Sequence, residues 1–376
     1  MRWDRVAMWT VFALILGFVT LAVSGLITLR LTATTDWPIG IKVLILMAIG
    51  LIFVSPFLLR GIPWRPDSTV AYVLSYVTYF LFVMVFLFFS LMILRDVIWL
   101  IGRWLCPRIP SPFQAVAVAR ANLGLLILVF GLSLYALYEG TKVPVLREIT
   151  LYSDKIKAPL TVAVLPDIHV HGALSAKKLK GLIERTRARR PDIVLLAGDI
   201  VDDRAEALAD FVPLLSELQA PDGVYVTSGN HEVYVGLEMA KDIFRRVGWR
   251  YLHNESQQVR PDVRIAGVPD IQDRRNPPDM GRTLPASSAY TILLAHTPKM
   301  FDMPHNTADL QVSGHTHGGQ IFPFHLLAWL SNKYLSGLYQ SGNRFLYVSR
   351  GAGQWGPQMR LLAPSEITVI TILPNK

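Results

Sequence analysis

Ile193-Val-Leu-Leu-Ala-Gly-Asp-Ile-Val-Asp202 is the most informative stretch of this chain. Its first half is a continuous run of β-branched residues and leucine, which predicts a strand covered on both faces. Two carboxylates, Asp199 and Asp202, follow the run directly. Ligands of open α/β sheets collect outside the carboxyl ends of strands. The stretch therefore predicts a buried strand that ends at a functional site.

The same kind of run recurs along the C-terminal part of the chain, with helical patterns between the runs. Strands are predicted at residues 160–165, 193–197, 224–227, 263–268, 290–294, 310–312, 345–349 and 367–373. Helices are predicted at residues 176–188 and 237–247. Strands that alternate with helices are typical of an α/β fold.

Residues that commonly bind metals follow five of the predicted strands. They are Asp167 and His169, then Asp199, then Asn230, then His296, and finally His315 and His317. A lone histidine is most often structural, but five segments that present such side chains at equivalent positions rarely arise by chance. Because rigid strands direct loop residues to one edge of a sheet, the pattern predicts a metal site there.

The donor atoms indicate which metals fit. Carboxylate, amide and imidazole donors without a thiolate suit Mn²⁺, Fe or Zn²⁺. A pair of ions about 3.5–4 Å apart needs a bridging ligand, for which Asp199 is the candidate. In an extended segment, His315 and His317 share a face and approach the ions together. Such ions lower the pKa of a bound water, which predicts hydroxide for in-line attack on phosphorus.

The N-terminal part is of a different kind. The 376-residue chain is 52% hydrophobic and 17% charged, against roughly a quarter charged in ordinary soluble domains. Residues 1–140 are predicted to be a helical membrane anchor, with spans at residues 6–29, 41–59, 69–94 and 122–138. Residues 141–157 are expected to be a connector and residues 158–376 the catalytic domain. No carboxylate or histidine within the spans suggests a transport path.

Charge gives a weaker indication of location and partners. A net charge of +9 suits either nucleic acid or an anionic membrane surface. The apolar half favours the membrane, and no nucleic-acid partner is expected because aromatic residues do not interleave with the basic ones. Lys155 and Lys157 tip the flanking charge toward a cytoplasmic catalytic domain at the cell (inner) membrane.

The motifs together resemble those of the calcineurin-like metallophosphoesterase superfamily over residues 158–373. They are Asp167-Ile-His169, Gly198-Asp199-Ile-Val-Asp202, Gly229-Asn230-His231-Glu232, His296 and Gly314-His315-Thr-His317. The stretch Gly314-His-Thr-His-Gly-Gly-Gln-Ile-Phe-Pro-Phe324 is similar to a bacterial membrane-associated branch that includes UDP-2,3-diacylglucosamine hydrolases. The resemblance implies a two-sheet sandwich flanked by helices, here with an N-terminal transmembrane bundle of four helices.

The resemblance also implies roles for individual residues. Asp167, His169 and His317 would hold one metal, and Asn230, His296 and His315 the other, with Asp199 between them. Manganese is the favoured metal. His231 would stabilise or protonate the leaving oxygen, and Asp202 would orient His231.

Three further features bear on the substrate. The segment Ile321–Tyr339 carries Phe322, Phe324 and Trp329, and it predicts either a flap that admits a lipid or an element packed on the core. Arg274 and Arg275, and separately Arg350, are candidates to clamp a phosphate. The basic run from Lys177 to Arg190 is typical of a solvated helix face, although an anionic bilayer would also attract it.

These observations favour a hydrolase that cleaves a phosphate ester or pyrophosphate bond of a lipid-linked or nucleotide-lipid substrate, with membrane lipids as partners. Two alternatives stay open at this point. One is a phosphodiesterase or phosphatase for soluble nucleotides or phosphoproteins, and the other is a metal-free membrane scaffold.

Overall fold

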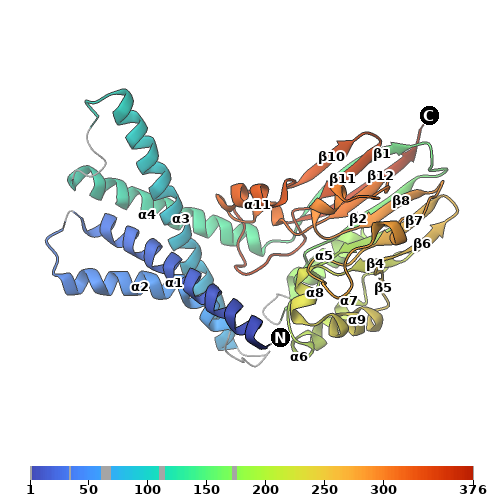
Figure 1. Cartoon of the computed structure of the whole chain (residues 1–376), viewed down its shortest axis with the longest axis horizontal. Helices are drawn as coiled ribbons and strands as arrows, with labels where there is room; N and C mark the ends of the chain where they lie inside the picture. Colours follow the sequence, from blue (N-terminus) through green and yellow to red (C-terminus); the bar gives the residue numbers. More distant parts are fainter. Residues whose placement is uncertain (1, 34, 61–68, 110–114, 172–175, 376) are drawn as a thin grey trace. The chain divides into compact units, whose positions relative to one another are not determined.

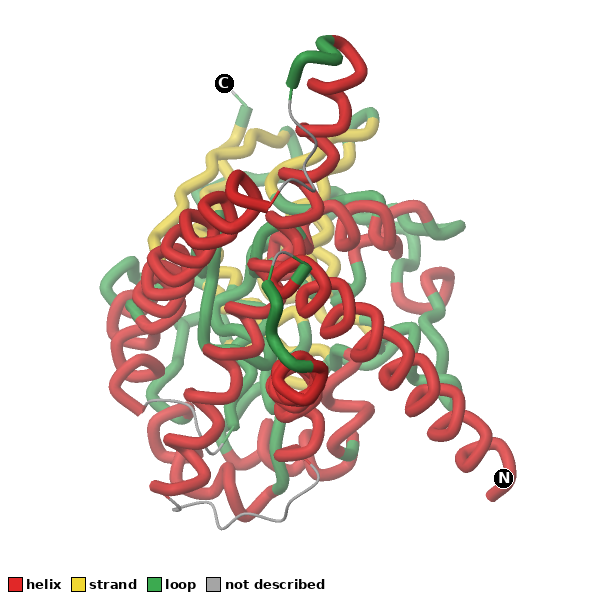
Figure 2. Tube along the Cα trace, turned by 90° about the vertical axis from the view of Figure 1, so that its left-hand side faces the viewer, coloured by secondary structure: helices red, strands yellow, loops and turns green. Residues whose placement is uncertain are grey.

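The computed structural model describes residues 2–33, 35–60, 69–109, 115–171 and 176–375. The chain forms two compact units, Met1–Leu137 and Tyr138–Lys376. Among the described residues, the first unit is helical, and every strand, drawn in yellow in Figure 2, belongs to the second unit.

The first unit is built from four long helices. They are α1 (Arg2–Thr32), α2 (Ile39–Arg60), α3 (Thr69–Leu105) and α4 (Ala115–Thr141), whose last turn belongs to the second unit. All four are long and apolar enough to cross a membrane. A polar cluster joins three of them: Arg30 pairs with Asp96 at 2.6 Å, and Arg95 donates to Asn122 at 2.6 Å. Asp96 is therefore neutralised by the arginines beside it.

The second unit contains two mixed six-stranded sheets (Figure 1). The first sheet has the order β1 (Val145–Ser153), β12 (Glu366–Pro374), β2 (Leu160–Val164), β3 (Ile193–Ala197), β4 (Val224–Thr227) and β5 (Arg250–Tyr251). The second has the order β10 (Gly337–Ser341), β11 (Arg344–Val348), β9 (Leu310–Ser313), β8 (Tyr290–Leu294), β7 (Val263–Gly267) and β6 (Glu255–Arg260). The strands β2, β3 and β4 run parallel, and so do β7, β8 and β9. Their carboxyl ends therefore meet at one edge of each sheet.

The sandwich follows from the alternation of side chains along the buried strands. Val162 and Val164 of β2 enter the core between the sheets, where they join Ile292 of β8. Ala163 and Leu165 point to the other face and pack under the helices. Both faces of β2 are thus covered, as its unbroken apolar run predicts.

Helices cover the outer faces of the sheets. The outer core of the first sheet includes buried residues of α5 (Ala176–Arg187), α7 (Val212–Leu215) and α9 (Leu237–Arg246). The remaining short helices are α6 (Ala205–Leu208), η1 (Ala209–Phe211), α8 (Asn230–Val235), α10 (Met280–Thr283), η2 (Pro298–Asp302), η3 (His317–Gly319) and α11 (Phe324–Asn332). The predicted fold, two sheets flanked by helices, is confirmed.

The stretch 141–157 differs from the connector expected there. It contains β1, which pairs in parallel with β12 along its whole length, from Val145 opposite Glu366 to Ser153 opposite Pro374. Only Leu151 of this strand is fully buried. The strand lacks the continuous apolar run of its neighbours because it lies at the edge of the sheet.

Candidate metal centre

The predicted ligands lie on loops at the carboxyl ends of strands from both sheets. Asp167 and His169 follow β2, Asp199 follows β3, and Asn230 begins α8 just after β4. The second sheet contributes His296 after β8, and His315 and His317 after β9. The site therefore lies where the edges of the two sheets meet.

Several of these residues have an uncommon backbone conformation. Positive φ angles are adopted by Asp167 (56°), His169 (49°), Asp199 (55°), His315 (73°) and His317 (50°). Residues other than glycine rarely adopt this left-handed region, and such strain clusters at functional sites. Two motif glycines have a steric role, because a Cβ on Gly229 would overlap the carboxylate of Asp199 and one on Gly314 would overlap that of Asp167.

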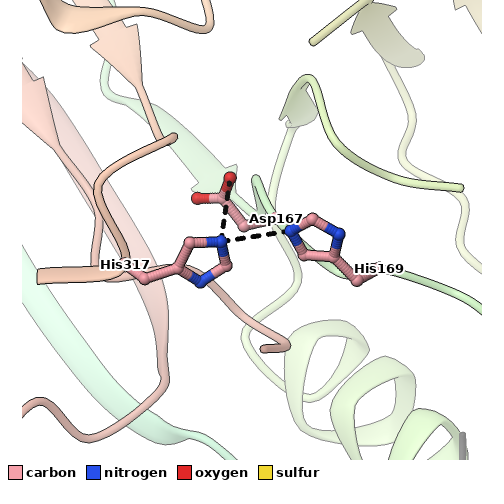
Figure 3. Close-up of side chains that lie close together, drawn as sticks. All are labelled: Asp167, His169 and His317. Carbon is pink, nitrogen blue, oxygen red and sulfur yellow. Dashed lines mark hydrogen bonds and ion pairs between the residues drawn. The ribbon is translucent and has the colours of Figure 1, made fainter. Parts of the chain in front are cut away.

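Asp167, His169 and His317 form the first group of converging donors (Figure 3). The Nε2 atoms of His169 and His317 are 3.1 Å apart, and Nε2 of His317 is 3.8 Å from Oδ1 of Asp167. All three side chains are buried. Two imidazole nitrogens and a carboxylate oxygen thus point at one small volume, as ligands of a shared cation do.

Asp199, His296 and His315 form the second group. Nε2 of His296 lies 3.1 Å from Oδ2 of Asp199 and 3.2 Å from Nδ1 of His315. The amide oxygen of Asn230 joins them, 2.9 Å from Nδ1 of His315. Burial, with help from the charge of His296, lowers the pKa of His315 to about 4, so its imidazole is neutral and free to bind a metal.

Asp199 connects the two groups. The same Oδ2 atom that faces His296 is 3.8 Å from Nε2 of His169 in the first group. One carboxylate thus faces both volumes, which is the placement that a bridging ligand requires. The seven residues fit a pair of divalent cations in both donor type and direction.

His231 and Asp202 form a hydrogen-bonded pair beside these groups. Nδ1 of His231 lies 2.5 Å from Oδ1 of Asp202, and its Nε2 lies 4.0 Å from Oδ2 of Asp199. Burial alone would lower the pKa of His231, but the hydrogen bond to Asp202 and the charges of Asp199 and Asp202 outweigh it and raise that pKa. Both carboxylates therefore favour the protonated form of His231, and Asp202 orients its ring.

Two buried residues support the site, and sequence reasoning gave neither of them a role. The carboxylate of Glu232 accepts hydrogen bonds from the backbone amides of Asp199, Ile200, Val201 and Gly229. It fixes the loop that carries the bridging candidate, and its place in the Gly-Asn-His-Glu motif was the available signal. Arg360 is fully buried and donates to the backbone oxygens of His317 and Ala363 at 3.2 and 2.8 Å. No local pattern marks this arginine.

The weaker substrate candidates are scattered. Arg274 and Arg275 are exposed after β7, and nothing in the described part of the chain links their guanidinium groups to the metal ligands. Arg350 lies against the metal-binding loop, because its Cγ would be 3.0 Å from a Cβ on Gly318.

The aromatic candidates lie on or beside α11. Phe322 is half-buried just before the helix. Phe324 and Trp329 are exposed on it.

The fold and the site together are those of a metal-dependent phosphoester hydrolase. The calcineurin-like phosphoesterase family model matches residues 160–319. An uncharacterized metallophosphoesterase of Helicobacter pylori is 37% identical over 262 residues, which make up 68% of this chain and 70% of that protein. The chain belongs to the calcineurin-like phosphoesterase family.

Two further comparisons differ in weight. A Danio rerio transmembrane protein with metallophosphoesterase domain is 30% identical, with 71% of this chain and 67% of that protein covered. Among solved structures, Haemophilus influenzae NAD nucleotidase is similar over 52% of this chain and 46% of the nucleotidase chain. The TM-score is 0.35 and the sequence identity is 16%, which is too distant a likeness to support an argument.

Proposed function

We propose that this protein hydrolyses a phosphate ester or pyrophosphate bond of a lipid-linked or nucleotide-lipid substrate at a membrane surface. The observation that carries the hydrolytic step is the placement of Asp199 between two groups of donors, of which only His315 is not fully buried. In this proposal Asp167, His169 and His317 hold one divalent cation, and Asn230, His296 and His315 the other, with manganese favoured. When bound, the cations supply positive charge for the phosphoryl oxygens and lower the pKa of water.

The chain's own acid in this reaction is His231. Its Nδ1 faces Asp202, so its Nε2 is left to face the site. A hydrogen bond from Nδ1–H to the carboxylate fixes the tautomer and orientation of the ring. We assign His231 the transfer of a proton from Nε2 to the leaving oxygen, for which its raised pKa keeps the proton available.

The lipid part of the proposal is supported by the surroundings of His231. The exposed aromatic residues Tyr234 and Trp355 lie beside it, with ring centroids 5.5 and 6.2 Å from the imidazole. Aromatic side chains of this kind suit the boundary between apolar chains and a polar headgroup. The four candidate membrane spans bring such a substrate within reach, and we place the catalytic unit at the cytoplasmic face of the cell membrane.

The deciding experiment compares substrates. Full-length protein in detergent, loaded with Mn²⁺, would be assayed on a UDP-linked diacyl lipid and on a cyclic nucleotide, with Asp199→Asn as the inactive control. We expect turnover of the lipid to exceed that of the nucleotide. Preference for the nucleotide would favour the soluble-substrate alternative, and failure to hydrolyse even an aryl phosphate diester would favour a scaffold.

A further inference from the structure

One surface of the catalytic unit is apolar and uncovered. Leu326, Leu327 and Leu330 of α11 are 60%, 56% and 65% exposed, whereas Ala328 and Asn332 are buried. With 3.6 residues per turn, the three leucines point away from the face that packs on the unit. In Figure 1, α11 lies beyond the ends of β10 and β11 rather than against either sheet. Soluble surfaces rarely leave such a cluster uncovered unless a partner binds it.

This helix lies close in the structure to the end of the last candidate membrane span. That span ends at Thr141, and its last turn belongs to the catalytic unit. A Cβ on Gly140 would overlap the carbonyl group of Gln358, so the two backbones are in direct contact. A few residues on, Leu361 pairs with Ile321 in a β-bridge, and α11 begins three residues after Ile321.

Leu362, in the same loop, is 67% exposed and adds to the apolar surface. The backbone amide of its neighbour Leu361 donates to Gln320 at 2.9 Å, and the amide of Phe322 donates to Leu361 at 3.2 Å. These bonds hold Leu362 and the start of α11 together. The apolar surface is thus fixed near Thr141, where the last candidate span ends.

Basic side chains flank the same point. The helix α5 packs directly on the residues that follow the span, because Nη1 of Arg185 donates to the carbonyl of Pro144 at 2.8 Å. Lys177 and Lys180 on this helix are exposed. Each lysine or arginine near an anionic bilayer surface contributes about 1 kcal/mol to binding. The charge beside the span therefore complements anionic headgroups.

We infer that α11 and Leu362 form a membrane-docking surface whose partner is the bilayer to which the chain is anchored. The leucines of α11 enter the boundary between headgroups and acyl chains, and the tether supplied by α4 makes the binding local. Docking of this kind would present the site to a substrate that remains in the lipid. Only this consequence of docking rests on the proposed function.

The test measures how deep a label on α11 lies in the bilayer, and it does not depend on turnover. In a Cys106→Ser background, which removes the single cysteine of the chain, Leu330→Cys would carry a nitroxide label in nanodiscs of phosphatidylethanolamine and phosphatidylglycerol. Tyr152→Cys is the matched control, because Tyr152 is exposed near the far end of β1. We expect the label at position 330 to collide readily with oxygen but poorly with a water-soluble nickel chelate, at a depth of about 5–10 Å. The label at position 152 should show the reverse.

Two results would overturn the inference. Ready collision of the position-330 label with the nickel chelate would mean that α11 faces water. Protection from both reagents would mean that protein covers it, either the membrane bundle or a second copy of the chain.

An activity measurement separates this inference from the proposed function. Leu326→Glu/Leu330→Glu should hydrolyse an aryl phosphate diester in detergent like the wild type, but lose turnover of the UDP-linked lipid in vesicles. Equal turnover of that lipid by the variant and the wild type would contradict substrate presentation by docking. If the wild type does not hydrolyse the aryl phosphate diester, that result counts against the hydrolase proposal. The depth measurement remains valid in that case.

Discussion

At the scale of single residues, the two nitrogens of His231 face different groups. Nδ1 is engaged by Asp202, while Nε2 is 4.0 Å from the nearest carboxylate oxygen of Asp199. Donor atoms of His169, Asp199 and His231 lie within 4.8 Å of one another, so this histidine is also near enough to share a cation. Its assignment to proton transfer in the proposed function therefore calls for a variant that separates turnover from metal retention.

Replacing His231 with alanine tests that separation. We expect His231→Ala to lower kcat for an aryl phosphate diester by about 10²–10⁴-fold, because a positioned general acid contributes on that scale. Metal content per chain should stay at the wild-type value. Kinetics and elemental analysis on the same preparation give both quantities, and loss of metal in proportion to activity would instead make His231 a ligand.

Glu232 has a different role, since its carboxylate accepts four backbone amides around Asp199. In Glu232→Gln an NH₂ group faces those amides, which leaves buried donors unpaired at a cost of about 1–3 kcal/mol or more. We expect a clearly lower thermal midpoint than in Glu238→Gln, a control at an exposed position. Equal midpoints for the two variants would show that the Glu232 contacts do not stabilise the fold.

At the scale of elements, α5 holds the last turn of α4 through a buried lysine. Nζ of Lys178 donates to the carbonyl oxygen of Gly140 at 2.6 Å and also bonds Gln354. Burial, with the nearby charge of Arg360, lowers the pKa of Lys178 to about 7. The unfolded chain, with a lysine pKa near 10.5, therefore binds more protons than the folded one between pH 7 and 10.5.

This difference predicts a pH-dependent stability. Across that window Lys178 should raise the free energy of unfolding with pH, by about 1.4 kcal/mol per unit at most. Lys178→Met should remove this slope, whereas Lys180→Met, an exposed lysine on the same helix, should keep it. Denaturation of the full-length protein between pH 7 and 9 measures the slopes. Parallel slopes in the wild type and Lys178→Met would contradict the assignment.

The sequence predicts some elements far better than others. The strands β3, β4 and β8 lie at the predicted residues because each is buried on both faces and therefore consists of an unbroken apolar run. The strands β1, β5, β6 and β10 were not predicted, since they are partly exposed and carry mixed side chains.

The residues of the candidate site also differ in how well the sequence predicts them. Its ligands could be proposed because they follow strands, and the structure brings all seven together. Arg360 could not be proposed, because its contact with His317 joins residues that are far apart in sequence. For the aromatic segment, the sequence left packing and exposure equally open, and the exposure of α11 depends on tertiary structure.

At the scale of the whole molecule, we expect cation binding and folding to be coupled. The ligands come from both sheets, so the unfolded chain has no preformed site, and cations that bind only the folded state stabilise it. We expect a chelator to lower the thermal midpoint of the full-length protein, and added Mn²⁺ to restore it. His231→Ala should respond like the wild type and Asp199→Asn much less. A midpoint indifferent to the chelator would argue against resident cations.

The most direct measurement counts the cations. Purified full-length protein, loaded with Mn²⁺ and freed of excess, would be analysed for metal per chain and for turnover of an aryl phosphate diester, alongside Asp199→Asn. We predict a pair of ions per wild-type chain, with the pair and the turnover lost together when the bridging carboxylate is removed. Undiminished turnover by Asp199→Asn, or by protein stripped of metal, would contradict this prediction.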